Sequence, residues 1–361
     1  MQKDSSKEYL GSNAKNFSIL AFEEPEAHLH PNMQYKLLKF LGENIKNEVR
    51  QIFITTHSPN ITSKVKLDSL IVLTKLNNEI KISYPGKVFS SSEEDVNSKK
   101  YIERFLDVTK ADMFFAKNLI FVEGLAEQLL LPIFAEKLGI SLEDNHISIV
   151  NVNGRYFEHF IKLFNTDTSK FAIPKKVVCI TDQDPIKKMK PEGNWEKCYS
   201  FEINLEKESY EYEVTSNKTL ENLKELNKDS FYIATQKEGS TFEYEMLLEN
   251  YKSSFFITES VANKELLREM IKNVEKIKNK DDLLEEVNKF NKSKLRDLQI
   301  KYIENSEEDI QQKAKHIIAS RYLASIGKGE VAQELATVLS NDMEFNVPSY
   351  IKEALEWLCK K

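Results

Sequence analysis

The feature that most constrains the fold is an alternation of short apolar runs with helical patterns in the middle of the chain. Apolar runs of strand length span 119–122, 147–152 and 177–180, and the helical patterns between them span 125–138 and 156–164. Strands that alternate with helices form a parallel sheet that is covered on both faces. We therefore predict an α/β fold built on a parallel βαβαβ unit, which is Rossmann-like.

A shorter alternation precedes this unit. The apolar runs 17–22 and 52–56 are typical of strands, and a helical pattern lies between them. Residues 69–83 alternate in the manner of a hairpin. These patterns predict a separate, smaller α/β part at the beginning of the chain.

The sequence changes character after the third apolar run. Residues 186–197 are basic and are broken by Pro and Gly, so we interpret them as a loop. One more strand is expected at 231–234. From 258 to 361 the pattern is mostly helical, which predicts a helical C-terminal extension.

Composition narrows the class of protein. The chain has 361 residues, 41% of them hydrophobic, and lacks an uninterrupted apolar run of about 18 residues, which excludes disordered and membrane-spanning chains. Its cysteines, Cys179, Cys198 and Cys359, fit neither a disulfide framework nor a zinc motif. We expect a cytoplasmic protein with no membrane partner. The formal net charge is -6, so nucleic-acid binding requires a local basic surface or a bound metal ion.

Polar residues that can bind a ligand or take part in catalysis follow the first two apolar runs. In ILAFEEPEAHLHP, Glu23 and Glu24 come at the end of a strand, and ITTHSP brings His57 to the end of the next. Open α/β sheets bind their ligands at this edge. A carboxylate pair can hold Mg²⁺ and polarise a water molecule, and an imidazole can contact a γ-phosphate.

These segments resemble the Walker B, D-loop and H-switch stretch of ABC-type ATPases of the OLD/RecF-like branch, whose motif runs EEPExHLHP and later THSP. The resemblance implies that Glu23 binds magnesium, Glu24 is the general base and His57 is the switch histidine. The chain has no GxxxxGK(S/T) loop to hold phosphates. We therefore favour a partial ATPase head that braces a dimer or the next domain. We expect no ATP hydrolysis by this chain alone, with ATP required only if another chain supplies the P-loop.

A second group of carboxylates follows the later strands. FVEGLAEQ places Glu123 after a strand and Glu127 one helical turn later, and TDQDP carries Asp182 and Asp184, which strand alternation would point to one side. A parallel βαβαβ unit brings both strand ends together, so we expect the four carboxylates to converge. Clustered negative charges require neutralisation by divalent cations. The sequence therefore predicts a site for one or two Mg²⁺ or Mn²⁺ ions.

The order Glu-Gly after one strand and Asp-x-Asp after a later one resembles the TOPRIM domain shared by topoisomerases, primases and OLD-family nucleases. Gly124 is expected to permit a tight strand-to-helix turn, and VNGRYF, with Gly154, matches the second such turn of that domain. The OLD branch implies two further site residues. Glu243, in STFEYE, would be a metal ligand, with Glu245 as the less favoured neighbour, and Lys328, in IGKGEVAQELA, would stabilise charge in the transition state.

We accordingly predict a metal-dependent DNA endonuclease of the OLD/TOPRIM family that nicks DNA or cleaves both strands. Its catalytic residues would be Glu123, Asp182, Asp184 and Lys328, and its metal ligands Glu123, Glu127, Asp182, Asp184 and Glu243. The resemblance implies a role in anti-phage defence, as in Gabija-type systems, and assembly into a homo-oligomer, with a separate ATPase or helicase subunit as a further partner. Two alternatives stay open: a non-catalytic DNA-binding or assembly subunit derived from an OLD protein, and a TOPRIM topoisomerase-like or primase-like enzyme.

The predicted organisation has three parts. Residues 1–110 form the C-terminal part of an ABC-type ATPase domain, 115–250 the TOPRIM core and 251–361 a helical region that completes the site through Lys328. Near the Asp-x-Asp motif, Lys187, Lys188 and Lys190 form a basic run that we expect to contact the DNA backbone.

Overall fold

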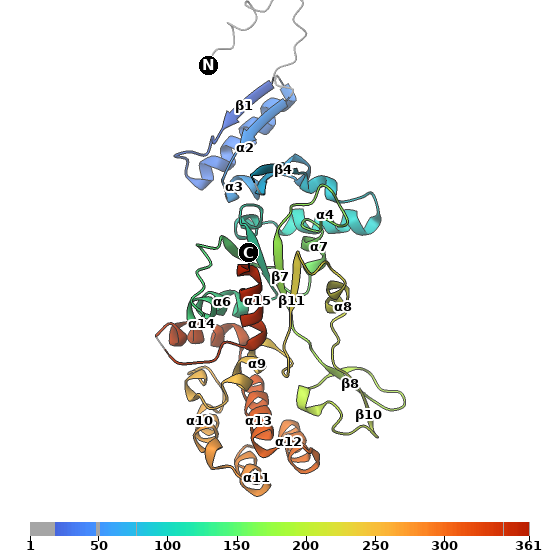
Figure 1. The fold of residues 1–361 in the computed structure, drawn as a ribbon, viewed down its shortest axis with the longest axis vertical. Coiled ribbons are helices and arrows are strands. Elements are labelled where there is room, and N and C mark those ends of the chain that lie inside the picture. Colours follow the sequence, from blue (N-terminus) through green and yellow to red (C-terminus); the bar gives the residue numbers. More distant parts are fainter. Residues whose placement is uncertain (1–18, 48–50, 77, 342, 361) are drawn as a thin grey trace, which may run out of the picture. The chain divides into compact units, whose positions relative to one another are not determined.

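The computed structural model describes residues 19–47, 51–76, 78–341 and 343–360. These residues form two compact units, drawn in Figure 1. The first unit ends at Phe115 and excludes 74–83, and the second consists of 74–83 and the chain from Ala116 onward. The division into residues 1–110, 115–250 and 251–361 that the sequence indicates stays a prediction.

The first unit contains the short α/β alternation expected near the beginning of the chain. Strand β1 (Ile19–Glu23) pairs in parallel with β2 (Gln51–Thr55), and helix α2 (Pro31–Asn47) connects them. The helices that follow are α3 (Pro59–Thr62), α4 (Glu93–Phe105) and α5 (Val108–Ala111). Helix α4 begins where the Ser92 hydroxyl accepts a hydrogen bond from the Asp95 amide, at 3.2 Å, which is a standard N-cap. The predicted hairpin is also present, as β3 (Val72–Leu76) and β4 (Glu79–Ser83), and from Thr74 onward it belongs to the second unit.

A four-stranded parallel sheet forms the centre of the second unit. Its strands are β5 (Asn118–Val122), β6 (Ile147–Asn151), β7 (Lys176–Ile180) and β11 (Phe231–Ala234), in the order β11-β7-β5-β6. Helices α6 (Leu125–Lys137) and α7 (Phe157–Ile161) follow the first two strands. All neighbouring strands run parallel. The predicted βαβαβ unit is therefore confirmed, and its first strand, β5, lies inside the sheet.

Burial on both faces explains why β5 is apolar throughout. All five of its residues are buried. Ile120 belongs to the large hydrophobic core that also includes residues of α6. Phe121 points to the other face, where its ring lies 5.9 Å from the ring of Phe160 and 6.0 Å from that of Phe164. A parallel strand covered on both faces has no solvent side on which polar residues could alternate.

The segment after β7 differs from the predicted loop. It forms a small antiparallel sheet of β8 (Ile186–Met189), β9 (Glu196–Lys197) and β10 (Tyr210–Glu213), with β8 in the middle. A buried ion pair between Lys187 and Glu202 anchors this insert. At Gly193 an added Cβ would lie 2.6 Å from the Met189 carbonyl oxygen, so the turn needs glycine. These strands were not predicted, because the segment is basic and rich in turn residues. Helix α8 (Lys218–Lys224) leads from the insert to β11.

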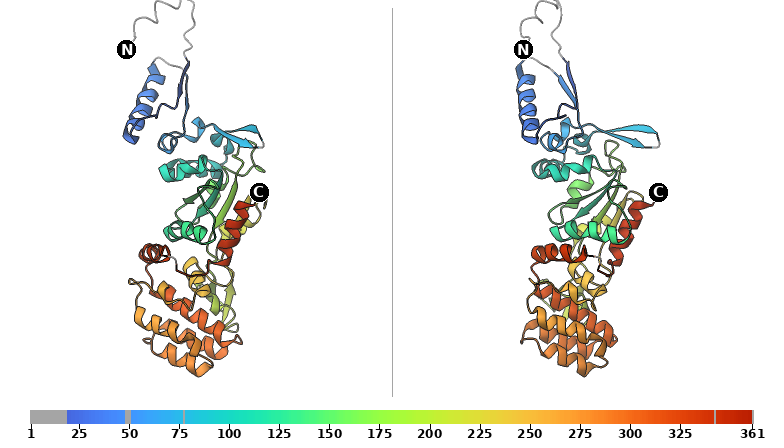
Figure 2. Two further views of the ribbon diagram at one scale, coloured as in Figure 1. Left: turned by 60° about the vertical axis from the view of Figure 1, so that its left-hand side comes forward. Right: turned by 90° about the vertical axis from the view of Figure 1, so that its left-hand side faces the viewer.

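The rest of the second unit is helical, as predicted. Its helices are α9 (Phe242–Glu249), α10 (Lys264–Asn273), α11 (Lys280–Asn288), α12 (Lys294–Asn305), α13 (Ile310–Ser325), α14 (Lys328–Leu339) and α15 (Ser349–Cys359). Figure 2 shows α10 to α13, in orange, packed together within this unit. Helix α14 lies against α6, and α15 lies against β7 and β11.

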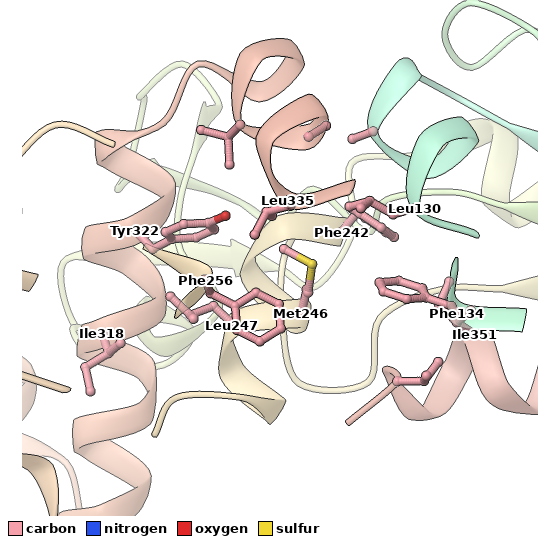
Figure 3. Packing of buried hydrophobic residues seen from close by; sticks show 14 of the residues in the cluster. Leu130, Phe134, Phe242, Met246, Leu247, Phe256, Ile318, Tyr322, Leu335 and Ile351 are labelled. Carbon is pink, nitrogen blue, oxygen red and sulfur yellow. The ribbon is translucent and has the colours of Figure 1, made fainter. Parts of the chain in front are cut away.

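One hydrophobic core joins these helices to the sheet. Figure 3 shows Phe242 and Met246 of α9 between Phe134 of α6 and Tyr322 of α13. All four side chains are at most 1% exposed. Because protein interiors are closely packed, this contact fixes the start of α9 with respect to α6.

Two simple sequence expectations also have structural counterparts. All three cysteines are free, with Cys179 and Cys198 buried. Within the described residues, no helix is both long enough and apolar enough to cross a membrane.

A buried lysine at the start of β7 gives the second unit a testable pH dependence. The Lys175 ammonium donates a hydrogen bond to the Ala116 carbonyl, and burial lowers the pKa of Lys175 to about 7. In the unfolded chain its pKa is about 10.4. Between these values the unfolded state holds the extra proton, so this group makes the folded state more stable as pH rises, by at most about 5 kcal/mol.

We expect Lys175→Met to flatten the dependence of unfolding free energy on pH between about 7 and 10. Urea unfolding at several pH values measures this, with Lys176→Met as the control for losing a charge from β7. An unchanged slope in Lys175→Met would show that the lysine does not titrate in this window.

Candidate active site

The carboxyl ends of β5 and β7 meet at one edge of the central sheet and bring three acidic side chains to one pocket. The pocket has a volume of about 510 Å³. Its lining residues include Glu123, Asp182, Asp184, Arg155, Lys197, Tyr199, Ser240 and Thr241. All belong to the second unit. This is the edge at which open α/β sheets bind their ligands.

Glu123 connects the two strand ends. Its Oε1 accepts hydrogen bonds from the Thr181 hydroxyl and from the Asp182 amide, the latter at 3.1 Å. Burial raises the pKa of Glu123 and the nearby charge of Asp184 raises it further, whereas the two hydrogen bonds and Arg155 lower it. The net pKa lies above the ordinary value for glutamate because desolvation is the largest of these effects.

Asp182 is held by neutral donors. Its Oδ1 accepts a hydrogen bond from the Gln236 side chain, at 2.7 Å, and another from the Phe242 amide, at 2.9 Å. Phe242 is the first residue of α9, and the free amides at a helix start favour a negative charge. The Asn217 side chain donates to the Asp182 carbonyl, at 3.0 Å, and to the Thr181 hydroxyl, at 2.7 Å.

Asp184, by contrast, faces two cations. Its Oδ1 lies 2.9 Å from the Lys197 ammonium and its Oδ2 lies 3.5 Å from the Arg155 guanidinium. The backbone of Asp184 has a φ of 50°, an uncommon conformation for a residue with a Cβ. A hydrogen bond of 3.1 Å from its amide to the Ser240 carbonyl helps to hold this turn.

The reason these two aspartates share a pocket differs from the predicted one. Strand β7 ends at Ile180, so strand alternation does not direct them. They lie in a turn whose middle residue is Gln183. The backbone carbonyl of Gln183 accepts a hydrogen bond from the Thr215 hydroxyl, at 2.7 Å, and its backbone amide donates one to the Gln236 side-chain oxygen, at 3.0 Å. The turn after β7 therefore orients both carboxylates, and the alternation of side chains along the strand does not.

Two other predicted metal ligands are not among the residues that line the pocket. Glu127 is buried in the first turn of α6, where its Oε2 would lie 3.1 Å from a Cβ added at Gly124. Glu243 is buried on α9, and its charge contributes to raising the pKa of Tyr322. Of the four carboxylates predicted to converge, Glu123, Asp182 and Asp184 line the pocket. The roles of Glu127 and Glu243 stay predictions.

The other predicted site residues of α9 and α14 are Glu245 and Lys328. Glu245 accepts hydrogen bonds from the backbone amides of Lys237, Glu238 and Gly239, so it anchors the loop before α9. Burial raises the pKa of Glu245 despite these hydrogen bonds. Lys328 is the first residue of α14, but its side chain lies outside the described part of the chain.

The donor set fits a hard divalent cation, because Mg²⁺ and Mn²⁺ prefer carboxylate oxygens. Within the described residues, no group of three or more His, Cys, Asp or Glu side chains is arranged to hold a metal ion. Both carboxylate oxygens of Asp184 face cationic side chains instead. The chemistry of the pocket therefore suits a metal ion, whereas the side-chain positions are those of a charge-neutralised pocket.

The first unit brings together the predicted residues of the ATPase motif. Glu23 lies opposite Thr55 at the end of the β1–β2 pair. The His57 Nε2 lies 3.4 Å from Oε1 of Glu24, whose backbone φ is 42°. Glu26 accepts a hydrogen bond from the His57 amide, at 2.9 Å. The expectation that Glu24 and His57 share one strand edge is confirmed.

Comparison with known families agrees with this geometry. Residues 114–184 match the family described as "Overcoming lysogenization defect protein-like, TOPRIM domain", and residues 5–62 match "AAA ATPase domain". The predicted resemblance to OLD proteins is confirmed. The predicted fold class, an ATPase part followed by a TOPRIM domain and a helical region, is confirmed as well.

Curated relatives carry nuclease names. "Endonuclease GajA" of Bacillus cereus (strain HuB5-5) is 26% identical over 95% of this chain and 49% of its own length. "OLD nuclease" of Thermus scotoductus is 25% identical over 39% of this chain and 27% of its own length. The chain spans about half the length of the first of these relatives and less of the other.

Two solved structures align over 68% of this chain. The C-terminal region of the Xanthomonas campestris pv. campestris OLD protein is 21% identical, with 94% of that chain covered and a TM-score of 0.33. The C-terminal region of the Burkholderia pseudomallei OLD protein is 22% identical, with 98% covered and a TM-score of 0.32.

The structure places the predicted basic run of the second unit in and directly after β8. Lys187 is buried against Glu202, so its ammonium is not available to a DNA backbone. Lys188 pairs with Glu211 at 2.8 Å, and the Lys190 ammonium donates to the carbonyl of Lys207, at 2.8 Å. Contacts of Lys188 and Lys190 with DNA stay predictions.

Sequence reasoning assigned no role to two side chains of the pocket, Arg155 and Lys197. Arg155 directly follows Gly154, and a cation was to be expected near three carboxylates because buried charges are normally paired. No sequence pattern marked Lys197 as a site residue, because it lies in the segment interpreted as a loop. Gln236 and Asn217, which hold the Asp182 turn, were also missed.

The two glycines of the TOPRIM turns have different roles. Gly154 has a φ of 112°, and its amide donates to the Glu123 carbonyl at 2.8 Å. Gly124 has a φ of -144°, an extended conformation open to any residue, so the predicted need for glycine freedom at this turn is wrong.

We expect Gly154→Ala to destabilise the protein by about 1–3 kcal/mol, because alanine is strained at this φ. Gly124→Ala should cost less than about 1 kcal/mol, since among the described residues an added Cβ would approach the end of a side chain, Glu127 Oε2 at 3.1 Å, and no backbone atom. Urea unfolding of both variants measures the difference, and equal losses would contradict this account.

Proposed function

We propose that this chain carries the catalytic site of a divalent-metal-dependent DNA endonuclease of the OLD/TOPRIM type. The observation that carries the proposal is the pocket at the ends of β5 and β7, where Glu123, Asp182 and Asp184 share one wall. The names of the relatives, endonuclease and OLD nuclease, support the same reaction class. Its substrate is DNA, and the reaction is hydrolysis of phosphodiester bonds by nicking or double-strand cleavage.

Glu123, Asp182 and Asp184 would hold Mg²⁺ or Mn²⁺, with Glu127 and Glu243 as further candidates for a second ion. A bound ion would lower the pKa of a water molecule and stabilise charge on phosphoryl oxygens. The protein positions the ligands: the Thr181 hydroxyl orients Glu123, and the Phe242 amide orients Asp182. Removing the donor of such a supporting hydrogen bond typically lowers metal affinity or activity 10–100-fold.

The wider role follows the family resemblance. We propose a function in anti-phage defence and a homo-oligomeric assembly in the cytoplasm. We also propose that Glu23, Glu24 and His57 act on ATP only together with a P-loop from another polypeptide or chain segment.

We expect Asp182→Asn and Asp184→Asn each to lower cleavage of supercoiled and linear DNA by at least about a hundredfold, because each removes a metal-ligating charge. Gel assays with Mg²⁺ or Mn²⁺ and with EDTA measure the loss. The matched control is Asp229→Asn, an exposed residue just before β11 and therefore at the other end of the sheet.

Thermal unfolding must show that both variants fold. Full cleavage by folded Asp184→Asn would refute the site. Metal-independent DNA binding without cleavage in the wild type would favour the non-catalytic alternative.

Lys328 is the fourth proposed catalytic residue. We expect Lys328→Ala to lower the cleavage rate by about two to three powers of ten, because a nearby ammonium stabilises charge that develops on the phosphoryl oxygens. Mn²⁺ affinity should stay unchanged. Lys352→Ala, on an exposed position of α15, is the control. A normal rate in Lys328→Ala would leave this lysine as the ordinary first residue of a helix.

A further inference from the structure

Asp184 differs from the other two carboxylates of the pocket in the kind of partners it has. Glu123 and Asp182 accept hydrogen bonds from neutral hydroxyl, amide and backbone groups. Asp184 instead lies 2.9 Å from the ammonium of Lys197 and 3.5 Å from the guanidinium of Arg155. Two cationic side chains therefore neutralise Asp184.

Both cations are able to move away from Asp184. The Lys197 side chain is 71% exposed and belongs to β9 of the small insert sheet. The Arg155 side chain is 38% exposed and projects from the turn after β6. Because both cations are partly exposed, each is hydrated once it leaves the ion pair, so separation costs less than for a pair in which both partners are buried. Asp184 itself is buried and fixed by its backbone, so the cations are the mobile partners.

The summed charge of the five described ionisable groups, Glu123, Asp182, Asp184, Arg155 and Lys197, changes sign when a divalent cation enters. Three ionised carboxylates with Arg155 and Lys197 carry one net negative charge. One divalent cation would turn this into one net positive charge, which one DNA phosphodiester group would neutralise. Arginine and lysine are the usual partners of phosphate oxygens.

We propose that Arg155 and Lys197 are phosphate-binding side chains that neutralise Asp184 before metal binding and transfer to the scissile phosphodiester when a divalent cation takes their place. This inference rests on the proposed endonuclease function. It assigns the same two residues opposite effects: they compete with the metal ion for Asp184, and they assist binding of DNA. A residue with a merely structural role would weaken both.

The test uses the full chain with Lys197→Met, Lys197→Arg and Arg155→Met. Calorimetric titration with Mn²⁺ alone, without DNA, measures the competition. We expect Lys197→Met to bind Mn²⁺ about two- to fivefold more tightly, the scale of one exposed ion pair. DNA cleavage at saturating Mn²⁺ should fall by about a hundredfold. Lys197→Arg should restore most of both properties, and Lys228→Met, in the loop before β11, should change neither.

Unchanged or weaker Mn²⁺ affinity in both Lys197→Met and Arg155→Met would overturn the inference, as would cleavage at the wild-type rate in both. Using two variants guards against misfolding of one. The proposed function fails in a different way, through cleavage that survives in Asp184→Asn. Because Mn²⁺ affinity is measured without DNA, the two failures are distinguishable.

Discussion

A carboxylate at the end of a fully buried strand loses much of its hydration, and hydrogen bonds have to offset that loss. This constraint acts on Glu123, because β5 is buried along its whole length. The Thr181 hydroxyl and the Asp182 amide supply the bonds, and both come from the chain just beyond β7. Stabilising one partly buried charge therefore also fixes the spacing of two strand ends, on which the whole pocket depends.

The other groups of the pocket come from elements far apart in the sequence. The start of α9 supplies the Phe242 amide, the insert sheet supplies Lys197 and the turn after β6 supplies Arg155. Helix α9 is held in place by the core in which Phe242 and Met246 pack against Phe134. The helical region thus contributes to the site through packing, because displacement of α9 would remove a donor from Asp182.

The two units carry separate chemistry. The first holds a glutamate and a histidine, Glu24 and His57, 3.4 Å apart at the edge of a two-stranded parallel pair. The second holds carboxylates and cations that suit a metal ion and a phosphodiester. Since the chain spans about half of its first curated relative, the interplay of nucleotide and DNA chemistry belongs to the proposals for the whole protein.

The sequence alone determined the central parallel sheet, because a strand buried on both faces must be apolar throughout, as 119–122 and 177–180 are. It also determined the acidic residues at the sheet edge, because such residues directly follow those runs. Only the tertiary structure decided which acids share the pocket. Glu127 and Glu243 have suitable positions in the sequence, yet neither lines the pocket, whereas Asp182 and Asp184 do so through a turn and not through strand alternation. The cations were equally hidden, because Lys197 reaches Asp184 through the pairing of β8 with β9, strands that the basic, turn-rich sequence of the segment did not indicate.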